Sequence, residues 1–212
     1  MRSALMVMAT LACGTAAAAD KDQLEVIGFS EDGKWFAYWT WGVSDGSGFP
    51  HAELNVHDVG RGRRDDKQSQ KLDVQTSDDK TTPTTALDQL KVARQAQLDQ
   101  LKLGKDPGVE LYKSGTPTRT SFTLAGRELE LRLLKTGGVD RKTGLPRETI
   151  ALTLTPKGGK ARLLFKGGEG FDFSLNSVRL SADGKSLAVF LKHSVRGFEG
   201  ADRRFLLVPA RL

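Results

Sequence analysis

The chain has 212 residues, of which 38% are hydrophobic and 27% charged, and its formal net charge is +6. A chain of this length can bury a sizeable core within one domain. Because charges of both signs are spread along the sequence, the mild basicity indicates solubility and argues against a nucleic-acid-binding protein.

The N-terminal segment has the pattern of a secretory signal. Arg2 supplies a positive charge, Ala4–Ala12 form a short apolar run, and Ala17-Ala-Ala19 precede Asp20. This pattern predicts a signal peptide over residues 1–19, so we expect the mature chain in the periplasm or outside the cell. No later segment is apolar enough to span a bilayer, and we expect no transmembrane segment after signal removal.

Cys13 supports a second interpretation of this segment. Leu11-Ala-Cys-Gly14 resembles a lipoprotein cleavage box, and an acyl group on Cys13 would anchor the same domain to a membrane. If cleavage instead follows Ala19, no cysteine remains, and the exported domain must be held together by its core.

A short motif, Ser-x-Asp-Gly-Lys, occurs at residues 30–34 and again at residues 181–185. Ser and Asp side chains bond nearby backbone amides in turns, and Gly tolerates a positive φ. We therefore interpret Asp32-Gly33 and Asp183-Gly184 as the structural turns of two β-hairpins. A weaker third copy is centred on Gly126, where Leu124-Ala125 replaces the acidic pair.

These turns divide the mature chain, residues 20–212, into three related hairpin units of a single β-rich domain. Each unit has two strands, a glycine-rich loop and a third strand. The units cover about residues 24–58 together with 108–113, residues 119–166, and residues 176–209. Residues 59–107 form an insertion in the first unit.

The insertion begins with a polar loop and continues as a helix. Residues 61–82 are charged and poor in apolar side chains, which is typical of a mobile loop. Thr85-Ala-Leu-Asp88 resembles a capping box, and the leucines at 87, 90, 98 and 101 share one helical face. We predict one α-helix over residues 85–103 that packs on the sheets, with a partner-binding helix as the alternative.

The hairpin units resemble the blades of Asp-Gly-type β-propellers, such as the carboxyl-terminal domain of the periplasmic protein TolB. Phe29-Ser-Glu-Asp-Gly-Lys34 and Leu180-Ser-Ala-Asp-Gly-Lys185 carry this resemblance. Because ordinary propellers have four to eight blades, three units are too few for one. We therefore expect a mainly β, antiparallel fold that is propeller-like, or a barrel or sandwich of hairpins, with one inserted helix.

Residues 28–37 and the stretch Gly42–Glu53 also resemble a bacterial family of predicted secreted proteins. That family is defined only by a domain of unknown function. The resemblance implies export and no established activity, so it assigns no site residues.

The most distinctive loop is Asp45-Gly46-Ser47-Gly48-Phe49-Pro50, which we interpret as a structured turn or as a loop that binds a ligand or partner. Asp45, Ser47 and Glu53 could offer oxygen atoms to Ca²⁺. They are too few for the six or more ligands that Ca²⁺ prefers. We therefore expect no cofactor, with calcium as a weak alternative.

Aromatic and histidine residues offer further candidates. Trp35, Trp39 and Trp41 share one strand face, where they form either core or an exposed platform for sugars. The histidines, which are His51, His57 and His193, have no spacing that demands a common metal or catalytic role.

No catalytic set is visible in the sequence, so we hypothesise a non-catalytic module of the cell envelope. It would bind a protein or polymer through its long loops. A secreted hydrolase that uses Asp45, Glu53 and a histidine near residues 43–53 is the first alternative. A carbohydrate-binding protein with exposed tryptophans is the second.

Overall fold

The computed structural model describes residues 21–44, 46–75, 80–113, 118–140, 144, 146–197 and 200–212. The expected signal peptide, with Cys13, and Asp45 of the predicted loop lie outside these described residues. The elements are β1 (Gln23–Phe29), β2 (Trp35–Val43), β3 (Pro50–Asp58), β4 (Arg63–Arg64), β5 (Gln70–Asp73), α1 (Pro83–Gln100), β6 (Val109–Lys113), β7 (Arg119–Leu124), β8 (Arg127–Val139), β9 (Pro146–Pro156), β10 (Arg162–Gly167), β11 (Phe171–Leu180), β12 (Ser186–Arg196) and β13 (Ala201–Arg211).

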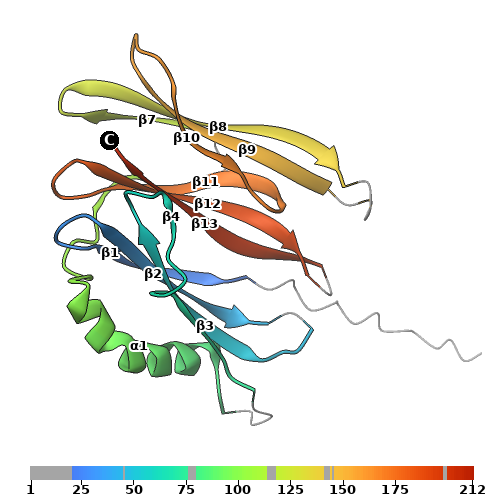
Figure 1. Ribbon diagram of the computed structural model, residues 1–212. Helices are drawn as coiled ribbons and strands as arrows, with labels where there is room; N and C mark the ends of the chain where they lie inside the picture. The colour runs from blue at the N-terminus through green and yellow to red at the C-terminus, as the bar shows by residue number, and fades with distance from the viewer. Residues whose placement is uncertain are drawn as a thin grey trace, which may run out of the picture.

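The strands form three antiparallel sheets. The helix-covered sheet contains β1 to β5, the outer sheet has the order β10-β9-β8-β7, and the central sheet has the order β13-β12-β11-β6. The sheets are stacked face to face, with the central sheet between the other two and α1 on the far side of the helix-covered sheet (Figure 1).

The middle of the central sheet is buried on both faces, which explains the long apolar run of β12. In β12, all six residues from Ser186 to Leu191 are buried, without the alternation of a half-exposed strand. One face of the sheet joins the larger core, in which leucines of β8 and β9 pack against β11 and β12. Alternating side chains therefore serve two cores from a single strand.

The opposite face of the central sheet packs on the helix-covered sheet through aromatic rings. Phe36 lies edge-on between Phe29 and Phe190, at ring-centroid distances of 4.7 and 5.8 Å. Phe190 comes from β12, so these rings join the two layers. Edge-to-face pairs of buried rings add about 0.5–1.5 kcal/mol beyond the burial of their area.

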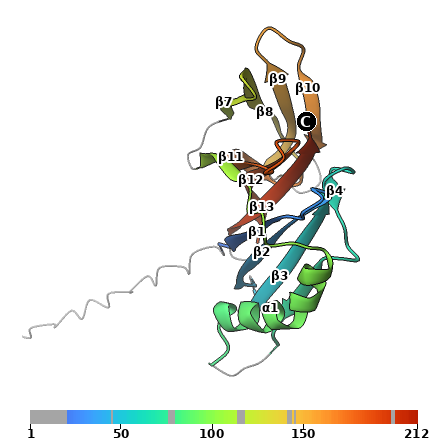
Figure 2. The ribbon, with the colours of Figure 1, turned by 90° about the vertical axis from the view of Figure 1, so that its left-hand side faces the viewer.

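Helix α1 covers the other face of β2 and β3 (Figure 2). Its buried side chains are Ala86, Leu87, Leu90 and Leu98. The helix begins earlier than the predicted capping box, because the N-cap is Thr82, whose hydroxyl accepts a hydrogen bond from the backbone of Thr85 at 3.2 Å. Pro83 follows at the first helical position, where its missing N–H costs nothing.

The stacked sheets correct several expectations. The strands of the described residues form three separate sheets and close into neither a barrel nor a propeller. Strand β6, assigned above to the first unit, pairs instead with β11 of the central sheet. Part of the predicted loop at residues 61–82 also forms β4 and β5, which pair with β3. Alternation in a sequence shows that a strand exists but does not name its partner.

The two Asp-Gly turns have matching geometry. In each, the serine hydroxyl bonds the aspartate carboxylate at 2.6 Å, and that carboxylate accepts the backbone N–H of the following lysine at 3.0 Å. The hydroxyl bond first, and the backbone bond second, hold the pKa values of Asp32 and Asp183 below the ordinary range. Gly33 and Gly184 adopt φ of +63° and +69°, which an L side chain would strain.

Among the residues that the structure describes, no helix combines the length and the apolar character needed to cross a membrane.

Candidate functional site

The predicted loop is a compact turn held by backbone bonds. The Gly48 N–H donates to the Ser44 carbonyl at 2.9 Å, and the Ser44 N–H donates to the Phe49 carbonyl at 2.8 Å. The Ser47 hydroxyl accepts the Phe49 N–H at 3.3 Å, so it is engaged inside the loop. These contacts give the loop a defined shape and leave Gly46 to Gly48 at the surface.

The expected calcium ligands show no common site in the described part of the chain. Glu53 accepts a hydrogen bond from the Arg64 guanidinium at 2.7 Å, which already neutralises its charge. No group of three or more His, Cys, Asp or Glu side chains among the described residues could hold a metal ion. Because Asp45 lies outside those residues, calcium binding there stays a prediction.

A polar cluster that the sequence did not indicate lies beside this loop. His51 contacts the Ser44 hydroxyl through Nδ1 and the Asp22 carboxylate through Nε2, each at 3.2 Å. The same Asp22 oxygen accepts from Arg204 at 2.5 Å, and Arg204 also bonds Asp202 at 2.8 Å. Asp22 and His51 side chains are only 9% and 7% exposed. The cluster joins the residue before β1, the residue after β2, β3 and β13.

The three histidines have different contacts. His57 stacks on Tyr38, and His193 stacks on Phe173 with ring centroids 4.9 Å apart. Neither His57 nor His193 shares a hydrogen bond or ring contact with His51 among the described residues. The tryptophans lie beneath α1, and Trp39 is 2% exposed. Trp35 and Trp41 are half-buried against the same core, so carbohydrate binding through the tryptophans stays a prediction.

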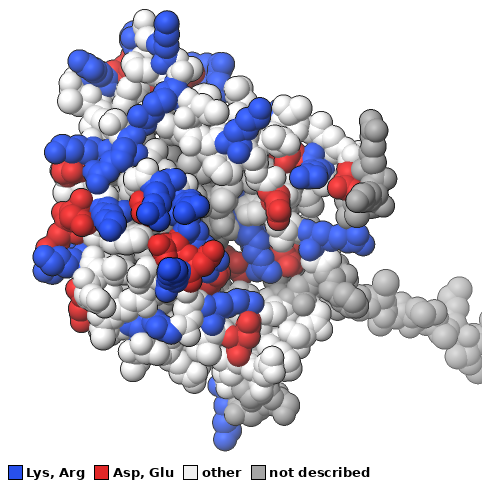
Figure 3. All heavy atoms as spheres, in the orientation of Figure 1, with Lys and Arg blue, Asp and Glu red and all other residues white. Residues whose placement is uncertain are grey.

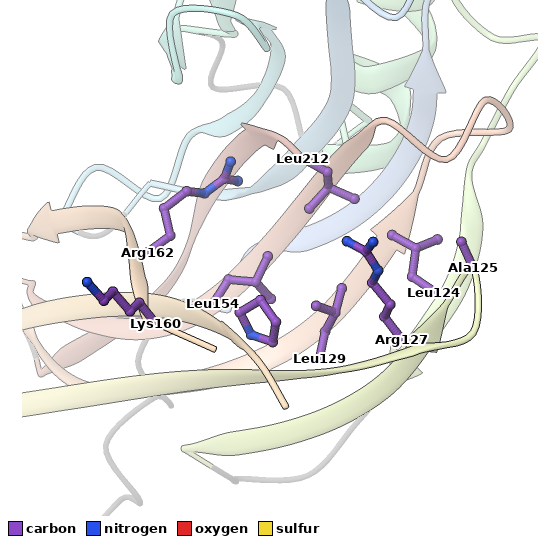
Figure 4. Close-up of a pocket in the computed structure, with 9 residues that line it drawn as sticks. Leu124, Ala125, Arg127, Leu129, Leu154, Lys160, Arg162 and Leu212 are labelled. Carbon is purple, nitrogen blue, oxygen red and sulfur yellow. The ribbon is translucent and has the colours of Figure 1, made fainter. Parts of the chain in front are cut away.

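The described residues also form a pocket of about 450 Å³ where the outer sheet meets the ends of β12 and β13 (Figure 4). Its apolar lining consists of aliphatic side chains and Pro156. The aliphatic lining residues are Leu124, Ala125, Leu129, Leu154 and Leu212. Leu129 and Leu154 are 8% and 5% exposed, so the floor of the pocket is continuous with the larger core.

A tight hairpin builds one wall of this pocket. Ala125 and Gly126 both have positive φ, at +48° and +76°, which is the geometry of a type I′ turn between two paired strands. The turn places Leu124 near the opposite hairpin, where its methyl group would be 3.9 Å from a Cβ at Gly184. The wall thus contains the weaker third copy of the turn motif, in which Leu124-Ala125 replaces the acidic pair.

Three cations line the same pocket. Arg127, Lys160 and Arg162 are exposed, and the Arg162 guanidinium bonds the Arg211 carbonyl. Arg127 and Lys160 form no ion pair with any residue that the structure describes. Lys and Arg side chains gather on this side of the molecule, over the ends of the outer and central sheets (Figure 3). The pocket therefore combines an apolar floor with unpaired positive charge.

The sequence contained one signal for this pocket. Leu124-Ala125 stands where the other two turns carry Asp32 and Asp183, which puts an apolar pair at the end of a hairpin. The cations come from separate segments and carried no such signal.

Comparison with known proteins places the chain in a family. No curated protein and no solved structure matches it significantly. Residues 37–164, more than half of the 212 residues, match a family whose description is "Predicted secreted protein (DUF2259)". That description agrees with the export expected from residues 1–19. The chain therefore belongs to this family of predicted secreted proteins of unknown function.

Proposed function

We propose that this exported protein is a non-catalytic binding module of the cell envelope and that its ligand enters the pocket between the outer and central sheets. The observation that carries the proposal is the pairing of an aliphatic floor with the unpaired cations Arg127 and Lys160. Ligand sites in proteins are mostly apolar hollows of roughly 300–1,000 Å³ with a few placed polar groups, and this pocket has that character.

The pocket favours a ligand with an apolar body and a negative charge. Burying the floor releases about 25 cal/mol for each Å² of apolar surface, and an anion satisfies the guanidinium of Arg127. This proposal moves the expected binding site away from the loop at residues 45–50, in which the Gly48 N–H, the Phe49 N–H and the Ser47 hydroxyl are engaged in local bonds.

Anilinonaphthalene sulfonate, a fluorescent dye with an apolar body and one negative charge, tests the proposal. We expect the folded protein to bind the dye at one site and the variant Arg127→Ala/Lys160→Ala to bind it about tenfold more weakly, which corresponds to about 1.4 kcal/mol. Lys71→Ala/Lys91→Ala is the matched control, because it removes the same charge from the helix-covered side. Equal dye affinity in all three proteins would contradict the proposal.

The Ser44–His51–Asp22 contacts support a second candidate function, a secreted hydrolase. A hydroxyl beside an imidazole that a carboxylate orients is the arrangement of a nucleophile, a base and an orienting group. In that role Nδ1 of His51 would take the Ser44 proton as the hydroxyl attacks an ester. It would then pass the proton to the leaving alcohol, and water would release the acid.

The hydrolase ranks second because Arg204 bonds the same Asp22 oxygen more closely than His51 does. That cation stabilises the carboxylate charge and weakens its hold on an imidazolium. A fluorophosphonate reagent, which labels activated serines, distinguishes the candidates when the labelled peptide is sequenced. Labelling of Ser44 that is lost in both Ser44→Ala and His51→Gln would support the hydrolase, and no labelling of the folded protein would exclude it.

A further inference from the structure

We infer that the pocket takes an unbranched aliphatic chain that ends in a carboxylate, which is the chemistry of a long-chain fatty acid. This inference rests on the proposed function, because it names the ligand class of that same pocket. Every lining residue is either a cation or an apolar residue with no polar side-chain atom.

The lining excludes most other ligand classes on chemical grounds. A sugar needs side-chain donors and acceptors for its hydroxyls, and a nucleotide base needs an aromatic face or amide groups. The pocket has neither aromatic nor amide nor hydroxyl side chains among its lining residues. A hydrocarbon chain has no hydrogen-bonding atoms, so it can pack against the leucines of the floor without leaving a polar group unpaired.

The positions of the three cations indicate at which end of the pocket the carboxylate of the fatty acid binds. In Figure 4 the Arg127 guanidinium lies beside Leu124 and Leu212, whereas Lys160 and Arg162 lie at the other end of the row of leucines. Arg162 is held by the Arg211 carbonyl, so among the described residues Arg127 is the lining guanidinium without an ion pair or hydrogen bond. A planar guanidinium binds a carboxylate through two parallel hydrogen bonds.

We therefore place the carboxylate at Arg127 and the hydrocarbon chain along Leu129 and Leu154. At the far end, the aliphatic stems of Lys160 and Arg162 can cover the chain while their charged heads stay in water. Arg127 is then the specificity-determining residue for the head group, and Lys160 contributes mainly contact area.

The test measures the binding of octanoate, decanoate and dodecanoate by calorimetry, below the concentrations at which they form micelles. We expect each added CH₂ that is buried to tighten binding about fourfold, from about 0.8 kcal/mol per methylene. The methyl ester of decanoate, which lacks the charge, should bind wild type at least about tenfold more weakly than decanoate.

The variants then separate the head group from the chain. Arg127→Gln should remove the preference for the acid over its ester, whereas Lys160→Gln should keep most of it. A leucine-rich peptide with a free C-terminal carboxylate is the competing source of the same chemistry. Tighter binding of that peptide than of dodecanoate would overturn the inference.

The outcomes distinguish this inference from the proposed function. If the dye binds through Arg127 and Lys160 but no fatty acid displaces it, the pocket is a binding site and its ligand is not an aliphatic carboxylate. If neither the dye nor a fatty acid binds, both proposals fail. Circular dichroism of each variant shows whether a loss of binding reflects a loss of fold.

Discussion

His57 is a buried residue with an unusual environment. Both ring nitrogens lack a hydrogen-bond partner among the described residues, and the ring stacks on Tyr38. Burial first, and the charge of Arg64 second, lower the pKa of His57 from 6.5 to about 3. The folded protein therefore holds this histidine neutral at pH values where the unfolded chain binds a proton.

The pH dependence of stability should reveal this difference. Between about pH 6.5 and 3 the unfolded chain binds more protons at this position, so the free energy of unfolding should fall with falling pH by at most about 1.4 kcal/mol per unit. His57→Leu should reduce that slope. It should leave the smaller contribution of His193, whose pKa burial also lowers, and below about pH 5 the contributions of Asp32 and Asp183, whose pKa values are lowered too. Urea unfolding at several pH values measures both, and an unchanged slope in His57→Leu would contradict the assignment.

At Gly28 the backbone of β1 lies so close to the backbone of Asp106 that there is no room for a side chain. A Cβ on Gly28 would lie 2.1 Å from the backbone oxygen of Asp106, and φ is +122°. That oxygen accepts the Phe29 N–H at 2.7 Å, so the contact cannot simply open. Gly28→Ala should lower the free energy of unfolding by at least about 2 kcal/mol. Gly137→Ala is the control, because nothing lies within 4 Å of its Cβ, and a similar loss in both would show that the contact is not the cause.

At the scale of elements, helix α1 depends on its first turn. Thr82→Ala removes the hydroxyl that accepts from Thr85 and should cost about 1 kcal/mol. Thr84→Ala, at an exposed helical position, should change the free energy of unfolding little or raise it slightly. Thermal unfolding measures the free-energy change of both variants. A loss in Thr82→Ala no larger than that in Thr84→Ala would contradict Thr82 as the N-cap.

The sequence predicted most strands and the partners within the hairpins, but not how strands distant in the chain pair. Alternation and the Asp-Gly turns located β1, β2, β11 and β12, because hairpin partners are neighbours in the chain. Strand β6 was assigned to the wrong sheet, because residues 109–113 can pair with any free edge of suitable length. Strands β4 and β5 were missed because their sequences are polar and short, and β3 alone provides their pairing.

The candidate sites were hard to predict for the same reason, since their residues come together from distant parts of the sequence. The histidine of the polar cluster was predicted as a candidate, but its partners Ser44, Asp22 and Arg204 come from three other segments. No spacing in the sequence connects residue 22 with residue 204. The pocket was equally hidden, because its floor is core of the outer sheet, and because Arg127 on β8 is distant in sequence from Lys160 and Arg162 at the start of β10.

At the scale of the whole molecule, the central sheet joins both sheet-to-sheet cores. Phe190→Ala should therefore cost about 3–5 kcal/mol and lower the stability of every layer together. All three tryptophans lie in β2, in the helix-covered sheet, whereas far-ultraviolet circular dichroism reports all layers. We expect the two signals to coincide during urea unfolding of both proteins. Separate midpoints would show that the layers unfold independently.

The positions of the three sheets along the chain determine when each layer can fold. The outer layers are encoded by residues 23–73 and 119–167, and most of the layer between them by residues 171–211. When the chain emerges from its N-terminus, the apolar faces of these two sheets therefore lack every strand of the central sheet except β6 until the last strands arrive. Such intermediates are prone to aggregate. We therefore expect the protein to remain unfolded, or bound to a chaperone, during export until about its last forty residues have crossed the membrane.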